Sequence, residues 1–184
     1  MPSPRALLKS LLIRLSYEKR EVTLASGRKS DFYIDVKQTS LNPEGAHLLG
    51  ELLFAEIRKS YPAAQAVGGP TLGADPLVSA VAIVSDLKGH PLPAFIIRKE
   101  PKAHGTGAWI EGGKNLAPSA RVVLIEDVLT TGGSLLTAVE KTLQAGFKIE
   151  GLIVVVDREE GGRESVEARG YTLRSLFTKS ELLK

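Results

Sequence analysis

Residues 121–134 read Arg-Val-Val-Leu-Ile-Glu-Asp-Val-Leu-Thr-Thr-Gly-Gly-Ser, and this stretch decides the fold that we expect for the chain. The apolar run at 122–125 is typical of a strand buried in a parallel sheet. Two adjacent acids, Glu126 and Asp127, lie at the carboxyl end of the strand expected over 121–126. Open α/β sheets bind their ligands at the carboxyl ends of the strands. The stretch therefore predicts a ligand site at the edge of a parallel sheet.

The short loop after the acids, Thr130 to Ser134, predicts an anion site. A helical pattern over 134–145 follows at once, and backbone N–H groups at a helix N-terminus bind phosphate. Carboxylates beside such a loop suit a sugar phosphate, because the acids accept from ribose hydroxyls while the loop holds the phosphate. The plainer alternative is that the acids solvate a loop that only turns the chain. It accounts for each half alone, but not for both halves in this order and spacing.

Strands alternate with helices along most of the remaining chain. Further strands are expected at 66–69, 93–98, 149–157 and 172–177, and further helices at 43–60 and 75–87. This alternation predicts an α/β fold with a mainly parallel sheet flanked by helices on both faces. A helix at 4–15 and a hairpin-like pair at 21–25 and 31–36 precede it. They break the alternation, so we expect them to form a small N-terminal hood.

Length and composition indicate one globular domain. The 184 residues suit a single unit over 1–184, with the helix and hood hairpin in 1–40 and the α/β core in 41–184. The chain lacks cysteine, its three histidines are scattered, and its net charge is only +3, with most basic residues dispersed among acids. These features argue against a protein-built metal cluster and against nucleic acid as a partner. No apolar run is long enough to span a membrane, and the cytoplasm is the expected location by default.

A second group of functional candidates leaves the strand at 93–98. We expect residues 99–114 to form a mobile catalytic loop. This loop contains Lys99, Lys102 and His104, and Arg98 lies just before it. A solvated surface loop is the plainer alternative. However, loops of this length without secondary structure are uncommon unless they are functional or disordered. Cations that close over a departing anion would stabilise its charge and exclude water.

Two rival phosphate motifs are absent. The stretch 68–73 has the first glycine spacing of a Walker A loop, but Ala74 and Asp75 stand where Lys and Ser or Thr are required. Gly105 and Gly107 begin a dinucleotide fingerprint whose third glycine is replaced by Ile110. Nucleotide binding through either motif is therefore not expected.

The motifs together resemble those of the orotate phosphoribosyltransferases, in order and at the right separations from about residue 22 to residue 162. The acids and the loop at 126–134 match the motif that binds phosphoribosyl pyrophosphate (PRPP) across the wider phosphoribosyltransferase group. The narrower resemblance comes from Arg98-Lys99-x-x-Lys102-x-His104-Gly105, Ser26-Gly27-Arg28-Lys29-Ser30 with Phe32-Tyr33-Ile34-Asp35, the pyrophosphate loop at 67–76, and Val156-Asp157-Arg158. The resemblance implies the type I phosphoribosyltransferase fold.

The resemblance also implies a role for each candidate residue. Lys102 and His104 would act in catalysis, either one donating a proton to the leaving group or the base. PRPP would be bound by Arg98, Lys99, Lys102, His104, Glu126, Asp127, Val128, Leu129, Thr130, Thr131, Gly132, Gly133 and Ser134. Orotate would be bound by Tyr33, Ile34, Thr130 and Arg158. Mg²⁺ would arrive on PRPP oxygens with few or no protein ligands, and a homodimer would share its active sites across the interface.

Alternatives remain open at several positions. Arg158 could instead pair at the surface with Glu159 and Glu160, and either Phe32 or Tyr33 could only pack the hood. Some relatives carry lysines where this chain has Ala25 and the 70–74 loop, so two cationic contacts to PRPP are missing or replaced, for instance by Lys29 or Lys37. At the level of function, the alternatives are a phosphoribosyltransferase for a purine base and a non-catalytic regulator that senses PRPP.

Overall fold

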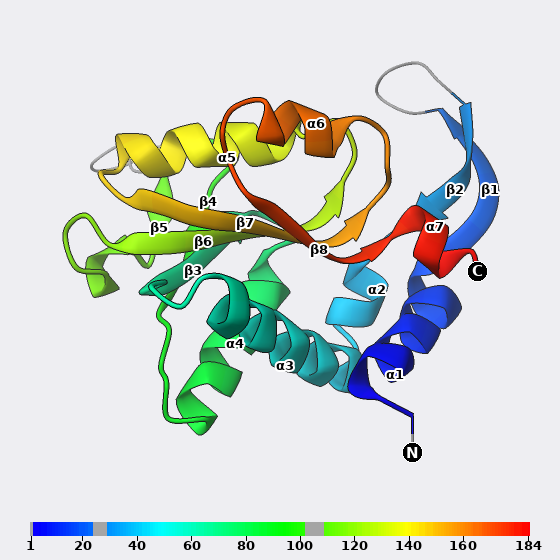
Figure 1. Cartoon of the computed structure of the whole chain (residues 1–184), viewed down its shortest axis with the longest axis horizontal. Helices are drawn as coiled ribbons and strands as arrows, with labels where there is room; N and C mark the ends of the chain where they lie inside the picture. The colour runs from blue at the N-terminus through cyan, green and yellow to red at the C-terminus, as the bar shows by residue number, and fades with distance from the viewer. Residues whose placement is uncertain (1, 24–28, 102–108) are drawn as a thin grey trace.

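The computed structural model describes residues 2–23, 29–101 and 109–184. Its centre is a six-stranded sheet with the order β5-β4-β3-β6-β7-β8, in which every pairing is parallel except that of β4 with β5 (Figure 1). The strands are β3 (Ala66–Pro70), β4 (Ala94–Ile97), β5 (Ile110–Glu111), β6 (Arg121–Leu129), β7 (Lys148–Asp157) and β8 (Leu173–Thr178). The predicted α/β architecture is confirmed.

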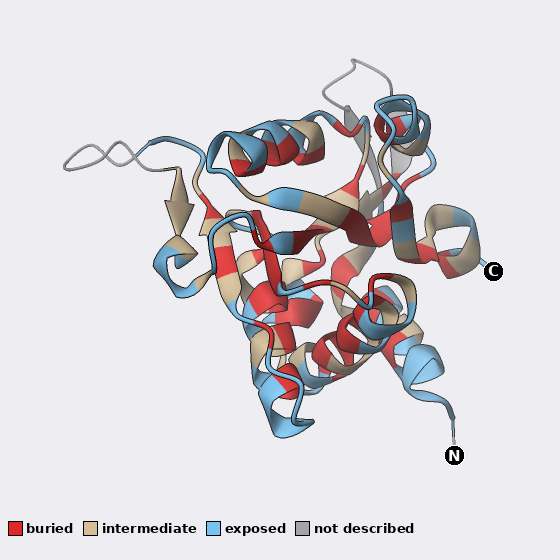
Figure 2. Cartoon of the chain, turned by 60° about the vertical axis from the view of Figure 1, so that its left-hand side comes forward, coloured by how far each residue is buried: buried red, intermediate tan, exposed pale blue. Residues whose placement is uncertain are grey.

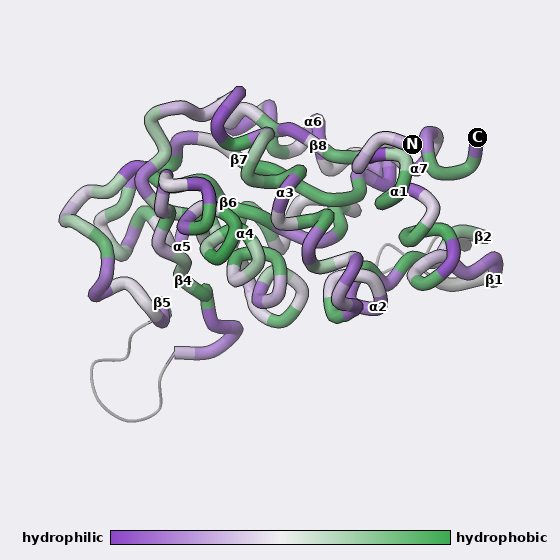
Figure 3. Tube along the Cα trace, turned by 90° about the horizontal axis from the view of Figure 1, so that it is seen from below, coloured by the Kyte–Doolittle hydropathy of each residue, from purple (hydrophilic) through white to green (hydrophobic). Residues whose placement is uncertain are grey.

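Helices cover both faces of this sheet, as the apolar pattern of its strands requires. One face carries α3 (Pro43–Ser60) and α4 (Asp75–Leu87), and the other carries α5 (Gly133–Gln144) and α6 (Gly162–Glu167) (Figure 1). On β6 the side chains alternate between two apolar clusters: Val123 and Ile125 join the first, Val122 and Leu124 the second. The sheet is therefore buried on both faces, and Figure 2 shows buried residues running through the strands. Hydrophobic colouring follows the same strands in Figure 3.

The helix α3 shows how local sequence sets an element boundary. Asn42 is its N-cap and its side chain accepts hydrogen bonds from the N–H groups of Glu44 and Gly45, at 3.1 and 3.2 Å. Pro43 occupies the first turn. Arg58 and Lys59 lie in the last turn, where cations interact favourably with the negative end of the helix dipole. A cap of this kind contributes about 1 kcal/mol. The predicted helix at 43–60 is confirmed.

The N-terminal segment forms a separate small layer beside the sheet. It contains α1 (Pro4–Leu11), a π-helical turn η1 (Leu12–Ser16), the antiparallel pair β1 (Tyr17–Thr23) and β2 (Lys29–Ile34), and α2 (Lys37–Ser40). Leu8, Leu11 and Leu12 are buried in the same apolar cluster as residues of α3. The predicted helix and the predicted pair of strands are therefore present, although β1 begins at Tyr17 rather than at residue 21, and most of the predicted turn lies outside the described residues.

Several elements differ from the sequence prediction. β6 continues past residue 126 to Leu129, because Val128 and Leu129 pair with residues of β7. The expected loop at 99–114 contains β5, which pairs with β4, and so it is not wholly irregular. Three short helices were not predicted: α2, α6 and α7 (Lys179–Leu182). Within the part of the chain that the structure describes, no helix is long and apolar enough to cross a membrane.

Candidate active site

The acid pair lies on β6 at the carboxyl end of the sheet. Glu126 is only 7% exposed, and its pKa is raised to about 7. Burial is the main cause of the increase, and a hydrogen bond from the Ser134 side chain partly offsets it. Asp127 follows it and its pKa is also raised by burial, an effect that the nearby Lys37 ammonium opposes. Burial disfavours the charged form of each carboxyl, and this accounts for the direction of both pKa shifts. The two acids are therefore adjacent and both have raised pKa values, which is common at functional sites, and their role in binding a ligand stays a prediction.

The loop from Thr130 to Ser134 joins these acids to α5. Gly132 is the N-cap of α5 and has a φ of 85°, a conformation that glycine adopts without a steric penalty. No side chain of the described residues caps this helix, so its first N–H groups remain directed at the loop. Thr131, Gly133 and Ser134 are exposed, whereas Thr130 is half-buried. A helix N-terminus without a side-chain cap can bind an anion, and the phosphate site at this loop stays a prediction.

The N-terminus of α6 supports the loop from the other side. A Cβ atom on Gly162 would lie 2.4 Å from the carbonyl oxygen of Thr130, so only glycine permits this approach. Leu129, predicted to bind PRPP, is 1% exposed, and its carbonyl accepts from the N–H of Arg158 at 3.0 Å. Val128 is half-buried, and its N–H donates to the Asp127 carboxylate at 3.0 Å. The Leu129 carbonyl and the Val128 N–H are thus already hydrogen-bonded, so these two residues could contact a ligand only through their other backbone groups.

The loop from Pro70 to Ala74 closes against the acid pair. A Cβ atom on Gly73 would lie 2.4 Å from the Asp127 carboxyl group, which shows how closely the two segments meet. The Thr71 hydroxyl donates to the carboxylate of Asp75 at 2.8 Å, and the Thr71 N–H donates to Ile97 at 2.9 Å. The segment that resembles a pyrophosphate loop therefore lies beside the segment that resembles a ribose site.

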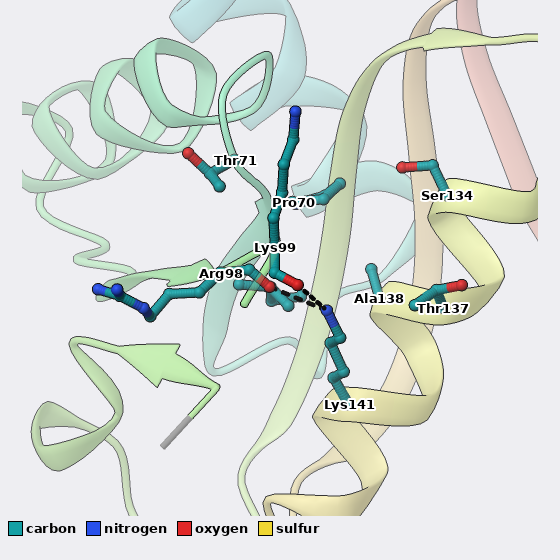
Figure 4. A pocket seen from close by; sticks show the side chains of 9 residues that line it. Pro70, Thr71, Arg98, Lys99, Ser134, Thr137, Ala138 and Lys141 are labelled. Atoms are coloured by element: carbon teal, nitrogen blue, oxygen red, sulfur yellow. Dashed lines mark hydrogen bonds between the residues drawn. The ribbon is translucent and has the colours of Figure 1, made fainter. Parts of the chain in front are cut away.

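A pocket opens between this loop, the end of β4 and α5. It is lined by Pro70, Thr71, Ile97, Arg98, Lys99, Ser134, Thr137, Ala138 and Lys141. In Figure 4 the Lys99 side chain extends past Thr71 and Pro70, whereas the Arg98 side chain points in another direction. The Arg98 guanidinium pairs with Glu111 at 3.0 Å. The structure therefore places Lys99 at the pocket and directs the Arg98 side chain away from it.

The remaining cations that the sequence singles out are distributed differently. Lys102 and His104 lie outside the described residues. Lys37 lies at the site: its ammonium is 2.6 Å from Asp35 and 3.9 Å from Asp127. The hydrogen bond to Asp35 is the main cause of the raised pKa of Lys37. Lys37 is therefore the candidate replacement cation that the structure brings to the acid pair.

Arg158 contacts the hood next to Tyr33 and Ile34, two of the other residues predicted to bind the base. Arg158 is 7% exposed and donates to the Phe32 carbonyl at 3.0 Å, joining β7 to β2. It pairs with Glu160 at 2.9 Å, so the expected pairing with a neighbouring acid exists but is buried rather than at the surface. Tyr33 is half-buried on one side of β2, whereas Ile34 is 6% exposed and belongs to the core. Tyr33 is thus better placed than Ile34 to contact a ligand.

Lys141 was missed by the sequence prediction, although it lines the pocket. Its ammonium donates to the carbonyl oxygens of Arg98 at 2.9 Å and Lys99 at 3.2 Å (Figure 4). In the sequence, Lys141 is distinguished only by lying on the same helix as Ser134, two turns later. That position alone does not indicate which backbone groups it reaches.

Comparisons with known proteins agree with this geometry. Residues 39–174 match the family model described as a phosphoribosyl transferase domain. Orotate phosphoribosyltransferases of Sorangium cellulosum and Bradyrhizobium diazoefficiens are each 46% identical to this chain, with 98% of the chain covered and 94% and 96% of those proteins. The crystal structure of Mycobacterium tuberculosis orotate phosphoribosyltransferase in complex with Fe(III) dicitrate superposes with a TM-score of 0.84, at 39% identity, covering 98% of this chain and 99% of that one.

A second Mycobacterium tuberculosis structure, in complex with PRPP, has a TM-score of 0.80 at 36% identity, covering 99% of this chain and all of that one. Adenine phosphoribosyltransferase from Leishmania tarentolae shares only the fold, with a TM-score of 0.66 at 18% identity. The predicted type I phosphoribosyltransferase fold is therefore confirmed. Sequence identity over almost the whole chain, together with the acid pair and its phosphate loop, shows that the chain belongs to the orotate phosphoribosyltransferase family of enzymes.

Proposed function

We propose that this chain transfers ribose 5-phosphate from PRPP to orotate, forming orotidine 5′-monophosphate and pyrophosphate for pyrimidine nucleotide synthesis. One observation carries the proposal most directly. Buried acids, an open helix N-terminus and a cation-lined pocket meet at one end of the sheet, around Asp127, Ser134 and Lys99. Those three environments correspond to the ribose, the 5′-phosphate and the pyrophosphate of PRPP.

In this proposal Glu126 and Asp127 hold the ribose hydroxyls. A carboxyl whose pKa is about 7 is partly ionised at neutral pH and is strengthened as an acceptor by its low-dielectric surroundings. Gly73 allows the pyrophosphate loop to approach Asp127 without a side chain between them. Hydrogen bonds from both ribose hydroxyls to these acids would restrict the orientation of the reacting carbon.

The leaving group explains the cations. The bond between ribose C1 and the pyrophosphate oxygen breaks, the sugar gains oxocarbenium character, and the electron pair departs with pyrophosphate. The ring nitrogen of orotate forms the new bond to C1 and loses its proton. Lys99 and Thr71 would bind that anion in the pocket, and Lys102 and His104 would add charge or a proton as it leaves. Alanine at Lys102 is expected to lower turnover by roughly 10², the scale seen when a transition-state donor is lost. Unchanged turnover would refute the role of Lys102.

Orotate is a carboxylate-bearing base, which suits the environment of Arg158. The Phe32 carbonyl and Glu160 hold the guanidinium in place, so a bound carboxylate would meet an oriented cation rather than a freely rotating one. Tyr33 would flank the ring from the hood, and Thr130 would contact the base from the phosphate loop. Ile34 would contribute through the core behind Tyr33.

Magnesium is proposed to enter bound to PRPP oxygens. Among the described residues no group of three His, Cys, Asp or Glu side chains could hold a metal ion, whereas two carboxylates, Glu126 and Asp127, are adjacent on β6. Mg²⁺ is commonly bound by one or two carboxylates together with substrate phosphates, and this donor set is compatible with that arrangement. When bound, the ion would neutralise charge on the pyrophosphate.

A homodimer that shares its active sites is also proposed, with a second copy of this chain seated against α4. Two observations support this face. Leu41 (73% exposed), Ile83 (63%) and Leu87 (80%) line one apolar hollow on this face, and Leu72 (63%) is exposed in the loop before α4. Leu72 belongs to the pyrophosphate loop, which leads directly into α4, so this face borders the site. Ile83→Glu is expected to yield a monomer in analytical ultracentrifugation, and an unchanged dimer would exclude this face.

Two alternatives remain testable. A purine phosphoribosyltransferase would share the PRPP site but would have little use for an oriented arginine facing an anionic base. A PRPP-sensing regulator would need no transferase activity. Purified protein with PRPP and Mg²⁺ should consume orotate, measured as a loss of orotate absorbance. It should leave hypoxanthine, adenine and uracil unchanged. Turnover of a purine instead would overturn the base assignment, and no turnover with any base would favour the regulator. The cytoplasm stays the expected location.

A further inference from the structure

Lys141 connects the two ends of the segment that carries the predicted catalytic loop. Its ammonium donates to the carbonyl oxygens of Arg98 and Lys99, at 2.9 and 3.2 Å, where β4 ends. The same ammonium lies 3.9 Å from the centre of the Trp109 ring, just before β5. One side chain of α5 therefore contacts both ends, although residues 102–108 between them lie outside the described residues.

Backbone pairing joins the same two ends. The N–H of Arg98 donates to the Trp109 carbonyl at 2.8 Å, and Ile97 pairs with Ile110 in the antiparallel ladder. This ladder is only two residue pairs long, and β5 is an edge strand. A short edge pairing of this kind is weak by itself. The cation from α5 adds a contact at the point where the ladder ends.

The donors of Lys141 are largely used by these contacts. An ammonium has three N–H donors. Two point at carbonyl oxygens, and the face of the indole ring lies on a third side. Bonds from a charged donor are stronger than neutral ones, and an ammonium over an indole adds further attraction. Lys141 is therefore better placed to hold protein groups than to bind a phosphate directly.

We propose that Lys141 is a positioning residue for PRPP binding. By fixing the backbone of Arg98 and Lys99 against α5 and Trp109, it sets the direction in which the Lys99 side chain extends into the pocket beside Thr71 (Figure 4). This inference rests on the proposed role of Lys99 in binding the pyrophosphate. No motif of the chain assigns a function to Lys141.

The test uses the full-length protein and two readouts. Trp109 is the single tryptophan of the chain, so its fluorescence reports on this contact without substrate. Lys141→Met removes the charge but keeps most of the side-chain length, and Lys141→Arg keeps the charge. Lys148→Met, at an exposed lysine at the start of β7, is the matched control. Lys99→Ala separately tests the residue that Lys141 is proposed to position.

In K141M we expect stronger acrylamide quenching of Trp109 and altered emission in the free protein. The KM for PRPP should rise, with kcat/KM lower by about tenfold to a hundredfold, the range produced when a binding group is misplaced by up to about 1 Å. The KM for orotate should change by less than about twofold, since the contact lies on the pyrophosphate side. K141R should recover part of both signals, and K148M should match the wild type.

Three results would overturn the proposal. Unchanged fluorescence and kinetics in K141M would mean that the contact has no role. A raised KM for PRPP with unchanged fluorescence would indicate that the ammonium binds PRPP itself. Altered fluorescence with unchanged kinetics would leave Lys141 a purely structural contact. If K141M does not fold, the same measurements are made on Lys141→Gln, which keeps a polar head.

If K99A leaves the KM for PRPP unchanged, the proposed role of Lys99 is wrong. The fluorescence of Trp109 would still report on the contact between Lys141 and Trp109.

Discussion

Replacing Glu126 with glutamine should stabilise the free protein at alkaline pH while it weakens the enzyme. The carboxyl is 7% exposed, and burial raises its pKa from 4.5 to about 7. The folded state therefore binds this proton more tightly than the unfolded state does. The stability that comes from the protonated form is complete below pH 4.5 and is lost as the pH rises toward about 7.

The size of the effect follows from the two pKa values. The difference between about 7 and 4.5, multiplied by about 1.4 kcal/mol per pH unit, gives about 3 kcal/mol. Wild type should thus lose up to about 3 kcal/mol of unfolding free energy through this one group between pH 4.5 and 7. The amide of Glu126→Gln does not titrate and can still accept from Ser134. Near pH 4.5 the two proteins should be about equally stable, and at pH 8 the variant should be more stable.

Urea unfolding measured at several pH values between 4.5 and 8.5 gives the required comparison. Glu140→Gln, at an exposed acid of α5, is the matched control and should show no pH-dependent difference. In parallel, E126Q should have a lower kcat/KM for PRPP, because a ribose acceptor has lost its charge. A difference between E126Q and wild type that stays constant across this pH range would refute the reasoning, since it would mean that Glu126 does not titrate differently on folding.

Three further predictions concern the neighbours of this acid pair. Gly73→Ala should displace the Asp127 carboxyl, which the added Cβ would approach to 2.4 Å, and lower kcat/KM for PRPP by about 10² while leaving the melting temperature nearly unchanged. Lys37→Met removes the charge that opposes the raised pKa of Asp127, so the acid limb of the pH profile of kcat/KM should move to higher pH; an unmoved limb would exclude this coupling. Arg158→Met should raise the KM for orotate more than that for PRPP and cost about 3 kcal/mol in urea unfolding, because Glu160 stays buried without its counter-charge. Adding Glu160→Gln should recover stability but not orotate affinity, and recovery of both would argue against contact with the base.

Local sequence was sufficient for the elements whose signals are short-range. The cap at Asn42, the apolar run of 122–125 and the glycines before α5 each act through neighbours within a few residues. For the same reason, the acid pair and the phosphate loop were recognisable as one motif. The family resemblance then extended the prediction to residues that are far apart in the chain, including Arg158.

Other features depended on partners that no local pattern identifies. β6 runs on to Leu129 only because β7 lies beside it, and α6 supports the phosphate loop through the close approach of Gly162. The orientation of Arg98 toward Glu111 required the presence of β5. Each of these outcomes reflects a long-range contact that overrides or completes a local preference.

By itself, the sequence determined the α/β class and the order of the major elements, because apolar periodicity and turn residues act locally, and its resemblance to a known family predicted the residues of the PRPP site. Only the tertiary structure decided which charges meet. Burial on β6 set the pKa of Glu126, folding of the hood brought Lys37 to Asp127, and packing of α5 placed Lys141 against the backbone of Lys99. The strength of these interactions depends on distance and dielectric environment, and both are fixed by the packing of segments that are remote in sequence.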